Sequence, residues 1–504
     1  MTTDIITLEK INDVYFKVYL TLEQSVELND FFSYYTPGYK FNPNFKKHLW
    51  DGKIRFYHSS DQTLPIGLYQ EFITFCKKFK YEYQIIADID DLRNNISDDK
   101  FKEFITTLFK DTNFIPRDYQ EESIKKALIN KRGIIELATA SGKSLLIYSI
   151  IRFIFATEEN AKILLIVPNI NLVNQMFNDF KEYGFKDAQS YTATVYSGSR
   201  NYKLNKPIII STWQSLINKP SSFFEDFNAV ICDECHLASA NSIKKILKNC
   251  NNASYRYGFT GTMPVDKSEF LTIVGFIGPE IYYMKYSELM DKGVLAKIKV
   301  VNIFLKYPQD IIKQIKYEQY EEELRILYDY PKRNNILKYI IDHLNPTENI
   351  LVLCHKIDHL KKIKKYLEDL YVPKGYTVYE TYGETTADDR ENIRQTMNKQ
   401  EQVILVGTYS TIGTGYNVRR IHHIILASSY RSKIRVLQSI GRGLRLHETK
   451  DKLMVWDIID DVRWTTRFGN ICKNYMYKHF EDRLKYYTEH GFNYINHNVV
   501  LENL

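Results

Sequence analysis

The sequence lacks the features that mark membrane, secreted and repeat proteins. It has no run of 18 apolar residues, so we expect no transmembrane helix. Met1 to Lys10 lack a charged segment followed by an apolar one, so no secretory signal is predicted. No low-complexity linker or fixed-period repeat occurs along the chain. These absences favour a folded protein of the cytoplasm.

Cysteine is also scarce, with six residues in a chain of 504. That density fits a reducing, intracellular compartment. Cys232 and Cys235 have the C-x-x-C spacing of a metal or redox pair, but no second pair lies at zinc-ligand spacing. We therefore interpret them as two small buried thiols at the end of a strand.

What the chain does have is length and a slight excess of positive charge. Its 504 residues are enough for two to four domains, and an apolar fraction of 44% can form ordinary hydrophobic cores. The formal net charge is +7, from 68 Lys and Arg against 61 Asp and Glu. This mildly basic balance permits a nucleic-acid partner without requiring one.

Two series of short apolar runs predict two α/β domains after a small α+β domain. Each run is typical of a buried parallel strand followed by a loop and a helix. The first series is Gly133–Leu137, Ile163–Val167, Ile208–Ser211, Val230–Cys232 and Tyr257–Phe259, and the second is Ile350–Leu353, Val378–Thr381, Val403–Val406, Ile424–Leu426 and Leu453–Trp456. The expected domains are 1–105, 106–285 and 286–462, followed by a helical extension at 463–504.

A phosphate-binding loop is predicted at residues 138–144, between the first strand and an apolar helix at Leu145–Phe155. In that context the backbone N–H groups and the helix N-terminus cradle phosphates. Lys143 would reach the β- and γ-phosphates of ATP, and the Ser144 hydroxyl would bind Mg²⁺. The loop departs from the usual pattern, because Leu137 occupies the first glycine position. The cofactor-binding candidates are Thr139, Ala140, Ser141, Gly142, Lys143 and Ser144.

An acidic pair follows another strand of the same series. Asp233 and Glu234 should lie at the carboxyl edge of the sheet, beside the phosphate loop. Asp233 would hold Mg²⁺, and Glu234 would orient or deprotonate an attacking water. Such a pair is often only a strand-end cap. His236 completes a D-E-x-H box ninety residues after Lys143 and favours the catalytic interpretation.

A third block, Q-x-x-G-R-x-x-R, lies in the second α/β domain and contains Gln438, Gly441, Arg442 and Arg445. An arginine side chain is planar and always charged, which suits a γ-phosphate. Arginines supplied from a facing domain complete an ATP site only when the two domains close. The spacing argues against the alternative, a solvated basic helix face. We therefore expect Gln438, Arg442 and Arg445 to take part in catalysis.

With these blocks in this order, residues 114–460 resemble the superfamily 2 helicases of the D-E-x-H type. The resemblance implies two tandem RecA-like parallel-sheet domains and ATP-dependent movement along nucleic acid, with ATP and Mg²⁺ as cofactors. It also implies that Arg117 and Gln120 read adenine and that Gly415 belongs to the fifth motif and the cofactor site. Thr260-Gly261-Thr262 resembles the motif that couples hydrolysis to nucleic-acid contacts.

A narrower resemblance spans nearly the whole chain. Residues 31–45, 50–55 and 64–68 are similar to the N-terminal domain of the UvsW-type recombination helicases of tailed phages, and residues 455–461 are also similar to that family. The family implies branch migration on Holliday junctions, stalled forks, D-loops and R-loops, and annealing of complementary strands. It implies branched, forked and single-stranded DNA as partners, RNA in R-loops, and phage recombination proteins. We expect a monomer in the bacterial host cytoplasm.

Strand ends of both α/β domains should line a groove for nucleic acid. Hydroxyls, amides and backbone N–H groups there suit phosphate and sugar contacts that do not read sequence. Trp213 would either stack on a base or pack in the core, and the sequence favours neither. The candidates are Pro168, Thr212, Trp213, Gln214, His355 and Thr408.

The N-terminal segment 31–58 combines ten aromatic residues with five basic ones and a single acid. We expect most of the aromatic residues to form the core of a small domain. The basic side chains, on turns and a hairpin, suit a DNA backbone; they are Lys40, Lys46, Lys47, Lys53 and Arg55. Six basic residues between 463 and 485, Arg483 among them, suit DNA contact or a solvated helical face equally well.

Three other functions share parts of this pattern. A duplex-translocating restriction subunit or a repair helicase uses the same engine, but usually carries nuclease, methylase or large accessory blocks that are not apparent here. An RNA-directed helicase shares the motor motifs, because backbone contacts discriminate RNA from DNA poorly unless a 2′-hydroxyl is read. A non-enzymatic DNA-annealing scaffold would have a dead ATP site, whereas Lys143, Asp233, Glu234 and Arg442 are all present.

Overall fold

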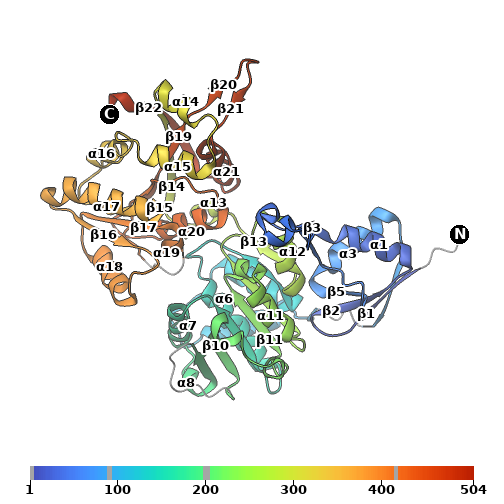
Figure 1. Ribbon diagram of the computed structural model, residues 1–504. Coiled ribbons are helices and arrows are strands. Elements are labelled where there is room, and N and C mark those ends of the chain that lie inside the picture. The colour runs from blue at the N-terminus through green and yellow to red at the C-terminus, as the bar shows by residue number, and fades with distance from the viewer. Residues whose placement is uncertain (1–4, 88–92, 197–204, 414–417) are drawn as a thin grey trace. The chain divides into compact units, whose positions relative to one another are not determined.

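The computed structural model describes residues 5–87, 93–196, 205–413 and 418–504. The chain forms two compact units, residues 1–137 with 142–283, and residues 284–504 with 138–141. Each unit contains a parallel sheet, as the two series of apolar runs predict, and each sheet has seven strands where the series named five (Figure 1). Within the described ranges, no helix combines the length and the apolar character needed to cross a membrane.

The sheet of the first unit contains all five strands predicted for it, and its order is β13-β7-β12-β11-β8-β10-β9. Most of its strand residues are buried, as expected for a parallel sheet with helices on both faces. The strands are β7 Arg132–Glu136, β8 Ile163–Val167, β9 Thr192–Val195, β10 Ile208–Thr212, β11 Ala229–Asp233, β12 Tyr255–Thr260 and β13 Glu280–Tyr283. The helices are α4 Asp98–Phe109, α5 Asp118–Asn130, α6 Lys143–Thr157, α7 Ile170–Glu182, α8 Ala188–Tyr191, α9 Trp213–Leu216, α10 Ser221–Phe224, α11 Asn241–Asn249 and α12 Lys267–Phe276.

The order of these strands positions the predicted ATP site. Because all of them are parallel, their carboxyl ends meet at one edge of the sheet. β7, β12 and β11 are consecutive, so the phosphate loop, the Thr260–Thr262 turn and the acidic pair follow three neighbouring strands. Strands in a sheet lie about 4.8 Å apart, which separates β7 from β11 by about 10 Å.

Cys232 and Cys235, near the end of β11, are both buried and form no disulfide, as predicted for two core thiols. No group of three or more His, Cys, Asp or Glu side chains suited to hold a metal ion occurs in the part of the chain that the structure describes.

Residues 6–87 form the predicted small α+β domain. Its four-stranded sheet has the order β5-β2-β1-β6, in which β1 is antiparallel to β2 and parallel to β6. Helix α3 buries Phe72 and Phe75 against this sheet. The elements are β1 Ile6–Lys10, β2 Tyr15–Tyr19, α1 Leu22–Phe31, β3 Ser33–Tyr35, α2 Pro43–Lys46, β4 Lys53–Arg55, β5 Thr63–Pro65, α3 Tyr69–Phe79 and β6 Tyr83–Ala87.

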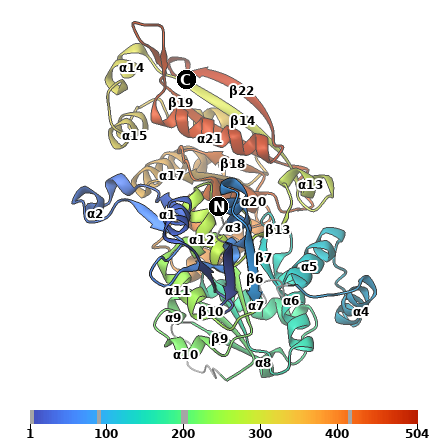
Figure 2. The ribbon, with the colours of Figure 1, turned by 90° about the vertical axis from the view of Figure 1, so that its right-hand side faces the viewer.

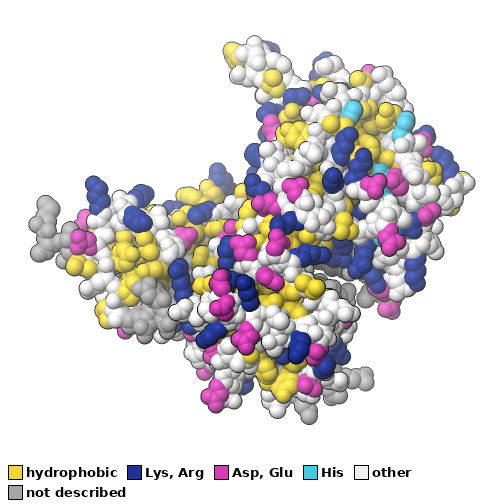
Figure 3. Space-filling model, turned by 180° about the vertical axis from the view of Figure 1, so that it is seen from behind, with side chains coloured by type: hydrophobic (Ala, Val, Ile, Leu, Met, Phe, Trp, Pro, Cys, Tyr) yellow, Lys and Arg dark blue, Asp and Glu magenta, His cyan; other side chains and the backbone are white. Residues whose placement is uncertain are grey.

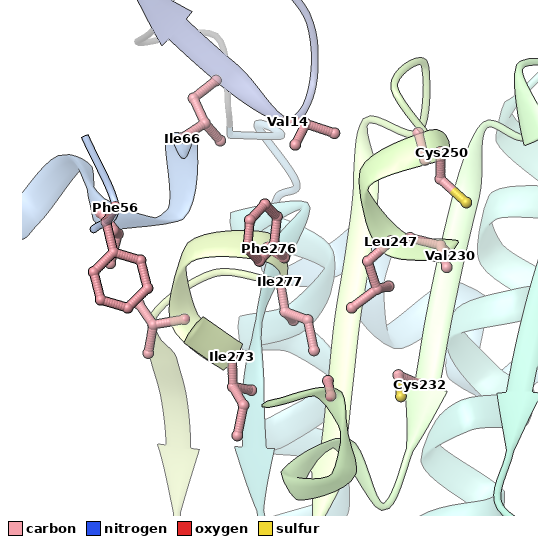
Figure 4. Packing of buried hydrophobic residues seen from close by; sticks show 14 of the residues in the cluster. Val14, Phe56, Ile66, Val230, Cys232, Leu247, Cys250, Ile273, Phe276 and Ile277 are labelled. Atoms are coloured by element: carbon pink, nitrogen blue, oxygen red, sulfur yellow. The ribbon is translucent and has the colours of Figure 1, made fainter. Parts of the chain in front are cut away.

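The small domain and the first α/β domain share one hydrophobic core (Figure 4). Gly67 lies so close to α12 that a Cβ atom there would overlap the backbone carbonyl of Val274. The buried Arg132, at the start of β7, donates Nη2–H to the carbonyl oxygen of Asp13 at 3.1 Å. The shared core includes Val14, Phe56, Ile66, Ile273, Phe276 and Ile277. The two domains therefore form a single folded body.

The sheet of the second unit has the order β16-β17-β15-β18-β19-β14-β22, and all of its pairs are parallel. Its strands are β14 Lys297–Lys306, β15 Ile350–Cys354, β16 Thr377–Thr381, β17 Val403–Thr408, β18 His423–Leu426, β19 Lys452–Asp461 and β22 Asn493–Val500. The helices are α13 Tyr286–Asp291, α14 Gln309–Ile315, α15 Tyr320–Tyr328, α16 Asn335–Asp342, α17 Ile357–Tyr371, α18 Ala387–Lys399, α19 Tyr409–Gly413, α20 Lys433–Gly443 and α21 Tyr475–Glu489.

The structure corrects the expectation that residues 463–504 form a helical extension. Only α21 is a long helix, and it lies beside β19 (Figures 1 and 2). It is preceded by a short hairpin of β20 (Trp464–Thr465) and β21 (Ile471–Cys472). Residues 493–500 form β22, which pairs with β14 at the edge of the large sheet. The end of the chain is therefore an integral part of the second sheet.

Two buried ion pairs hold the second unit together. Asp460 accepts from Nε of Arg333 at 2.8 Å, and Asp457 accepts from Nη2 of Arg483 at 2.7 Å. The four side chains are at most 1% exposed. Burial alone would lower the pKa of Arg333, but the charge of Asp460 more than offsets it and the pKa is raised. Arg483 is therefore a structural residue, and its interpretation as a surface contact is wrong.

Candidate ATP site and nucleic-acid interface

The phosphate loop begins directly after β7 and leads into α6. Gly142, at the start of α6, has φ +85°, and Ala140 has φ +71°. Glycine adopts such angles readily, whereas Ala140 holds one with a side chain present. Nζ of Lys143 donates to the carbonyl oxygen of Leu137 at 3.0 Å. Oγ of Ser144 lies 2.7 Å from the Tyr183 hydroxyl.

Gln120, a predicted adenine contact, packs against this loop. Its Oε1 accepts the backbone N–H of Arg117 at 2.9 Å, which caps the start of α5. A Cβ atom at Gly142 would overlap Nε2 of Gln120. The backbone angle therefore favours glycine at position 142, whereas the Gln120 side chain could move away from an added methyl group. The role of Arg117 and Gln120 in binding adenine stays a prediction.

Asp233, the first residue of the acidic pair, has a buried carboxylate oxygen without a donor among the described residues. Asp233 ends β11 and is 8% exposed, and no described residue donates a hydrogen bond to its Oδ1. Burial, followed by the charge of Glu234, raises the pKa of Asp233, while the charge of Lys143 opposes that rise. An orphaned carboxylate oxygen beside a second carboxylate suits a hard divalent cation such as Mg²⁺. The donors present, Asp233 and the hydroxyl of Ser144, fit that ion.

A chain of contacts leads from the acidic pair to the next strand. Glu234 occupies the turn after β11 with φ +51°, a strained angle for a residue with a side chain. Nδ1 of His236 lies 3.4 Å from Oε2 of Glu234 and 3.0 Å from Oγ1 of Thr260. Oγ1 of Thr260 accepts the backbone N–H of Thr262 at 3.2 Å. His236 therefore connects the acidic turn to the Thr260–Thr262 turn.

The third sequence block lies on α20 and just beyond its end. Gln438 and Arg442 are buried, and Nη2 of Arg442 donates to the carbonyl oxygen of Gly413 at 2.9 Å. Burial and then the charge of Arg442 lower the pKa of Arg445 to about 9. Nε of Arg445 has no acceptor among the described residues. This cluster of positive charge suits a phosphate. Gly415, assigned to the cofactor site, falls outside the described residues.

The predicted nucleic-acid contacts of the first unit follow β8 and β10. Pro168 comes directly after β8 and is half-buried. Thr212 ends β10, is buried, and places Oγ1 3.1 Å from Oγ of Ser215. Trp213 packs partly buried against the hydrophobic core, which favours the packing interpretation of its ring. Gln214 is exposed.

The predicted contacts of the second unit end β17 and follow β15, which are neighbours. Oγ1 of Thr408 lies 2.9 Å from Oγ1 of Thr411. The His355 ring lies 4.6 Å from that of Tyr430, and burial, followed by the charge of Lys356, lowers the pKa of His355. Nδ1 of His355 has no hydrogen-bond partner among the described residues. The lowered pKa favours the neutral ring, so this edge of the sheet carries an uncharged polar atom.

The aromatic residues of segment 31–58 divide into two groups. Phe32, Phe56 and Tyr57 are buried in the core of the small domain, as predicted. Residues 36–52, between β3 and β4, form a separate segment that we name the aromatic loop. In it the Tyr39 ring stacks on Tyr35 of β3 at 4.5 Å and meets the ring of Phe45 edge-on at 4.9 Å. The prediction that most of the aromatic residues form the core therefore holds for the first group and does not extend to this loop.

The five predicted basic contacts lie on the aromatic loop and on β4, the strand that follows it. Lys40, Lys46 and Lys47 are exposed. Nζ of Lys53 lies 5.2 Å above the Tyr35 ring. Arg55 forms an ion pair with Asp51 at 2.5 Å, so its charge is largely offset. The three exposed lysines are the strongest of the five candidates for phosphate contact.

Three family models match the chain. They are "DNA helicase UvsW, N-terminal" at residues 9–88, "Type III restriction enzyme, res subunit" at 113–265 and "Helicase conserved C-terminal domain" at 332–447. The chain is 33% identical over 486 residues to the ATP-dependent DNA helicase UvsW of Enterobacteria phage T4, covering 94% of this chain and 95% of that protein.

Two solved structures extend the likeness. The crystal structure of T4 UvsW aligns with a TM-score of 0.52 at 31% identity and covers 99% of this chain and 100% of that one. A fragment of a type I restriction HsdR subunit from Vibrio vulnificus YJ016 gives a TM-score of 0.58 and covers 89% of this chain and 76% of that one. Its identity of 19% shows a shared fold alone.

Proposed function

This chain belongs to the UvsW family of superfamily 2 ATP-dependent DNA helicases, and we propose that it is a branch-migration motor. In this proposal it unwinds Holliday junctions, stalled forks, D-loops and R-loops and anneals complementary strands. The observation that carries the proposal is the contact of His236 with both Glu234 and Thr260. That contact would transmit a change at the acidic pair to the sheet edge along which nucleic acid would lie.

The chemical steps are assigned to residues already described. The loop N–H groups and Lys143 bind the phosphates of ATP, and Ser144 and Asp233 hold Mg²⁺. When bound, that ion supplies positive charge to the phosphate oxygens. Glu234 orients the attacking water and accepts its proton. The positive cluster around Arg442 stabilises the charge that develops on the transferred phosphoryl group.

The grip on DNA is assigned to two kinds of surface. Polar groups at the strand ends, such as Thr408 and His355, contact the phosphates and sugars of one strand. The aromatic loop, with Lys40, Lys46 and Lys47, holds a duplex arm of the junction through its phosphates. A motor that steps on one strand while it holds an adjoining arm would move the branch point.

The test is ATP hydrolysis by the wild type and by Lys143→Ala, measured without nucleic acid and with single-stranded, duplex, forked and four-way DNA, and with RNA. We expect four-way and forked DNA to stimulate most, and the substitution to lower the rate by roughly 100-fold or more. Equal stimulation by all DNA forms would point to a simple translocase. Stimulation by RNA alone would point to an RNA-directed helicase, and no hydrolysis to an annealing scaffold.

A triple variant, Lys40→Ala with Lys46→Ala and Lys47→Ala, tests the loop separately. It should keep hydrolysis on single-stranded DNA and lose the preference for four-way DNA. The matched control replaces Lys100, Lys102 and Lys110, three exposed lysines on or next to α4. Both variants remove three positive charges. An equal effect of the two would mean that the loop acts only through its positive charge and not through its position.

A further inference from the structure

The hairpin of β20 and β21 stands at the same edge of the second sheet as the predicted nucleic-acid contacts. Leu426, the last residue of β18, pairs with Asp457, so the final four residues of β19 run on past it for about 13 Å. The hairpin follows directly. Since all strands of this sheet are parallel, His355 after β15 and Thr408 at the end of β17 lie at the same carboxyl edge.

Both ends of the hairpin are anchored in the fold. On the first side, Asp461 accepts from Nε and Nη2 of Arg463, each at 2.8 Å. On the second side, the buried Asn474 donates to the carbonyl oxygen of Asp460 at 3.0 Å and to Oε1 of Glu323 at 2.9 Å. Glu323 also accepts the first backbone N–H groups of α21. The base of the hairpin is therefore fixed on both sides.

The tip of the hairpin is a defined turn with an aromatic ring in water. Thr466 donates its backbone N–H to the carbonyl oxygen of Asn470 at 2.8 Å, and Gly469 takes φ +80°. Phe468 is 91% exposed and Ile471 is 63% exposed. Figure 3 shows hydrophobic side chains at the end of the hairpin. Because the Phe468 ring is almost fully exposed, it adds almost nothing to the stability of the folded chain. Its presence at the tip therefore needs an explanation other than folding.

The charge around the tip points to nucleic acid. The sequence has no acidic residue between Asp461 and Glu481, a stretch with four Lys or Arg. Arg467, next to Phe468, is exposed and forms no ion pair with a described residue. A stable protein interface buries about 800 Å² on each partner, far more than one ring on a short hairpin offers. A single ring beside an arginine is enough to stack on one base and to contact its phosphate.

We propose that the β20–β21 hairpin is a base-stacking contact, in which Phe468 stacks on an unpaired base and Arg467 contacts the neighbouring phosphate. The contact rests on the proposed function, since it needs a strand along the carboxyl edge of the second sheet. It adds a stacking group to a surface whose other contacts are polar. In this arrangement the hairpin engages bases that leave the duplex near the branch point.

The test compares a labelled oligo(dT) with an abasic oligonucleotide of equal length, because the two carry the same phosphates and differ in their bases. We expect Phe468→Ala to weaken binding of oligo(dT) by about 5- to 150-fold and to leave binding of the abasic strand within about twofold. Phe468→Trp should restore the oligo(dT) affinity. Arg467→Ala should weaken both strands alike and lower the salt dependence by about one phosphate.

Three results would overturn the stacking contact. One is an unchanged affinity of Phe468→Ala for both strands, and another is an equal loss on both. The third is a change from dimer to monomer in sedimentation, which would make the ring a protein contact. In each of these cases wild-type binding leaves the proposed helicase function standing. If the wild type binds neither strand, the proposed function fails and the stacking contact fails with it.

Discussion

The two large sheets have the same architecture, but their buried carboxylates differ in whether an arginine pairs with them. In the first, Asp233 is buried beside Glu234, and no described residue donates to its Oδ1. In the second, Asp457 and Asp460 are fully buried, and each accepts two hydrogen bonds from one arginine. An unpaired buried charge costs free energy, whereas a paired one belongs to the fold. The difference makes the buried carboxylate without an arginine partner the candidate for chemistry, and the two carboxylates paired with arginine a part of the fold.

The largest expected effect tests the first sheet. Glu234→Gln removes the proton acceptor, so we expect the rate of ATP hydrolysis with saturating DNA to fall by about 10²- to 10⁴-fold. The thermal midpoint of unfolding should stay the same or rise, because the charge that repels Asp233 is gone. Steady-state kinetics and calorimetry on the same sample measure both. A thermal midpoint several degrees lower would mean that Glu234 stabilises the fold, as the ion pairs of the second sheet do. That result would contradict the comparison.

The second effect tests the second sheet. Arg333→Met leaves Asp460 buried without its partner, which should cost about 3–5 kcal/mol of unfolding free energy, measured by urea denaturation. Adding Asp460→Asn should recover part of that loss, because the orphaned charge is removed. The control is Arg325→Met on α15, whose arginine pairs with Glu322 in solvent and should leave the urea midpoint unchanged. Equal midpoints for the two single variants would contradict the structural role.

The smallest effect extends the comparison from charge to contact, at the junction between the small domain and α12. Gly67→Ala forces a methyl group into the backbone of Val274, so we expect a loss of about 1–3 kcal/mol from overpacking. Gly383→Ala is the matched control, because no heavy atom lies within 4 Å of its added Cβ. Thermal unfolding of the two variants side by side measures the difference. An unchanged thermal midpoint for Gly67→Ala would mean that the small domain separates from α12 easily.

Local pattern was enough to predict five of the seven strands in each sheet and the position of the phosphate loop, whereas β9, β13, β14 and β22 were not predicted. Each of the predicted elements depends on neighbours a few residues away, such as the apolar run before Lys143. The ion pair of Arg333 and Asp460 joins residues 127 apart in the chain, and the sequence around neither residue predicts the pair. Arg483 was misread as a surface group for the same reason. β22 escaped prediction because its residues are mostly exposed and polar, as suits the edge of a sheet.

The overlap between Gly67 and α12 also has a mechanical consequence. Because that contact leaves no space and lies within a continuous core, the small domain has no hinge at this junction. The small domain and the first α/β domain are then one rigid body. We therefore expect the small domain to turn together with the first α/β domain, as one body and not as a part joined by a flexible tether.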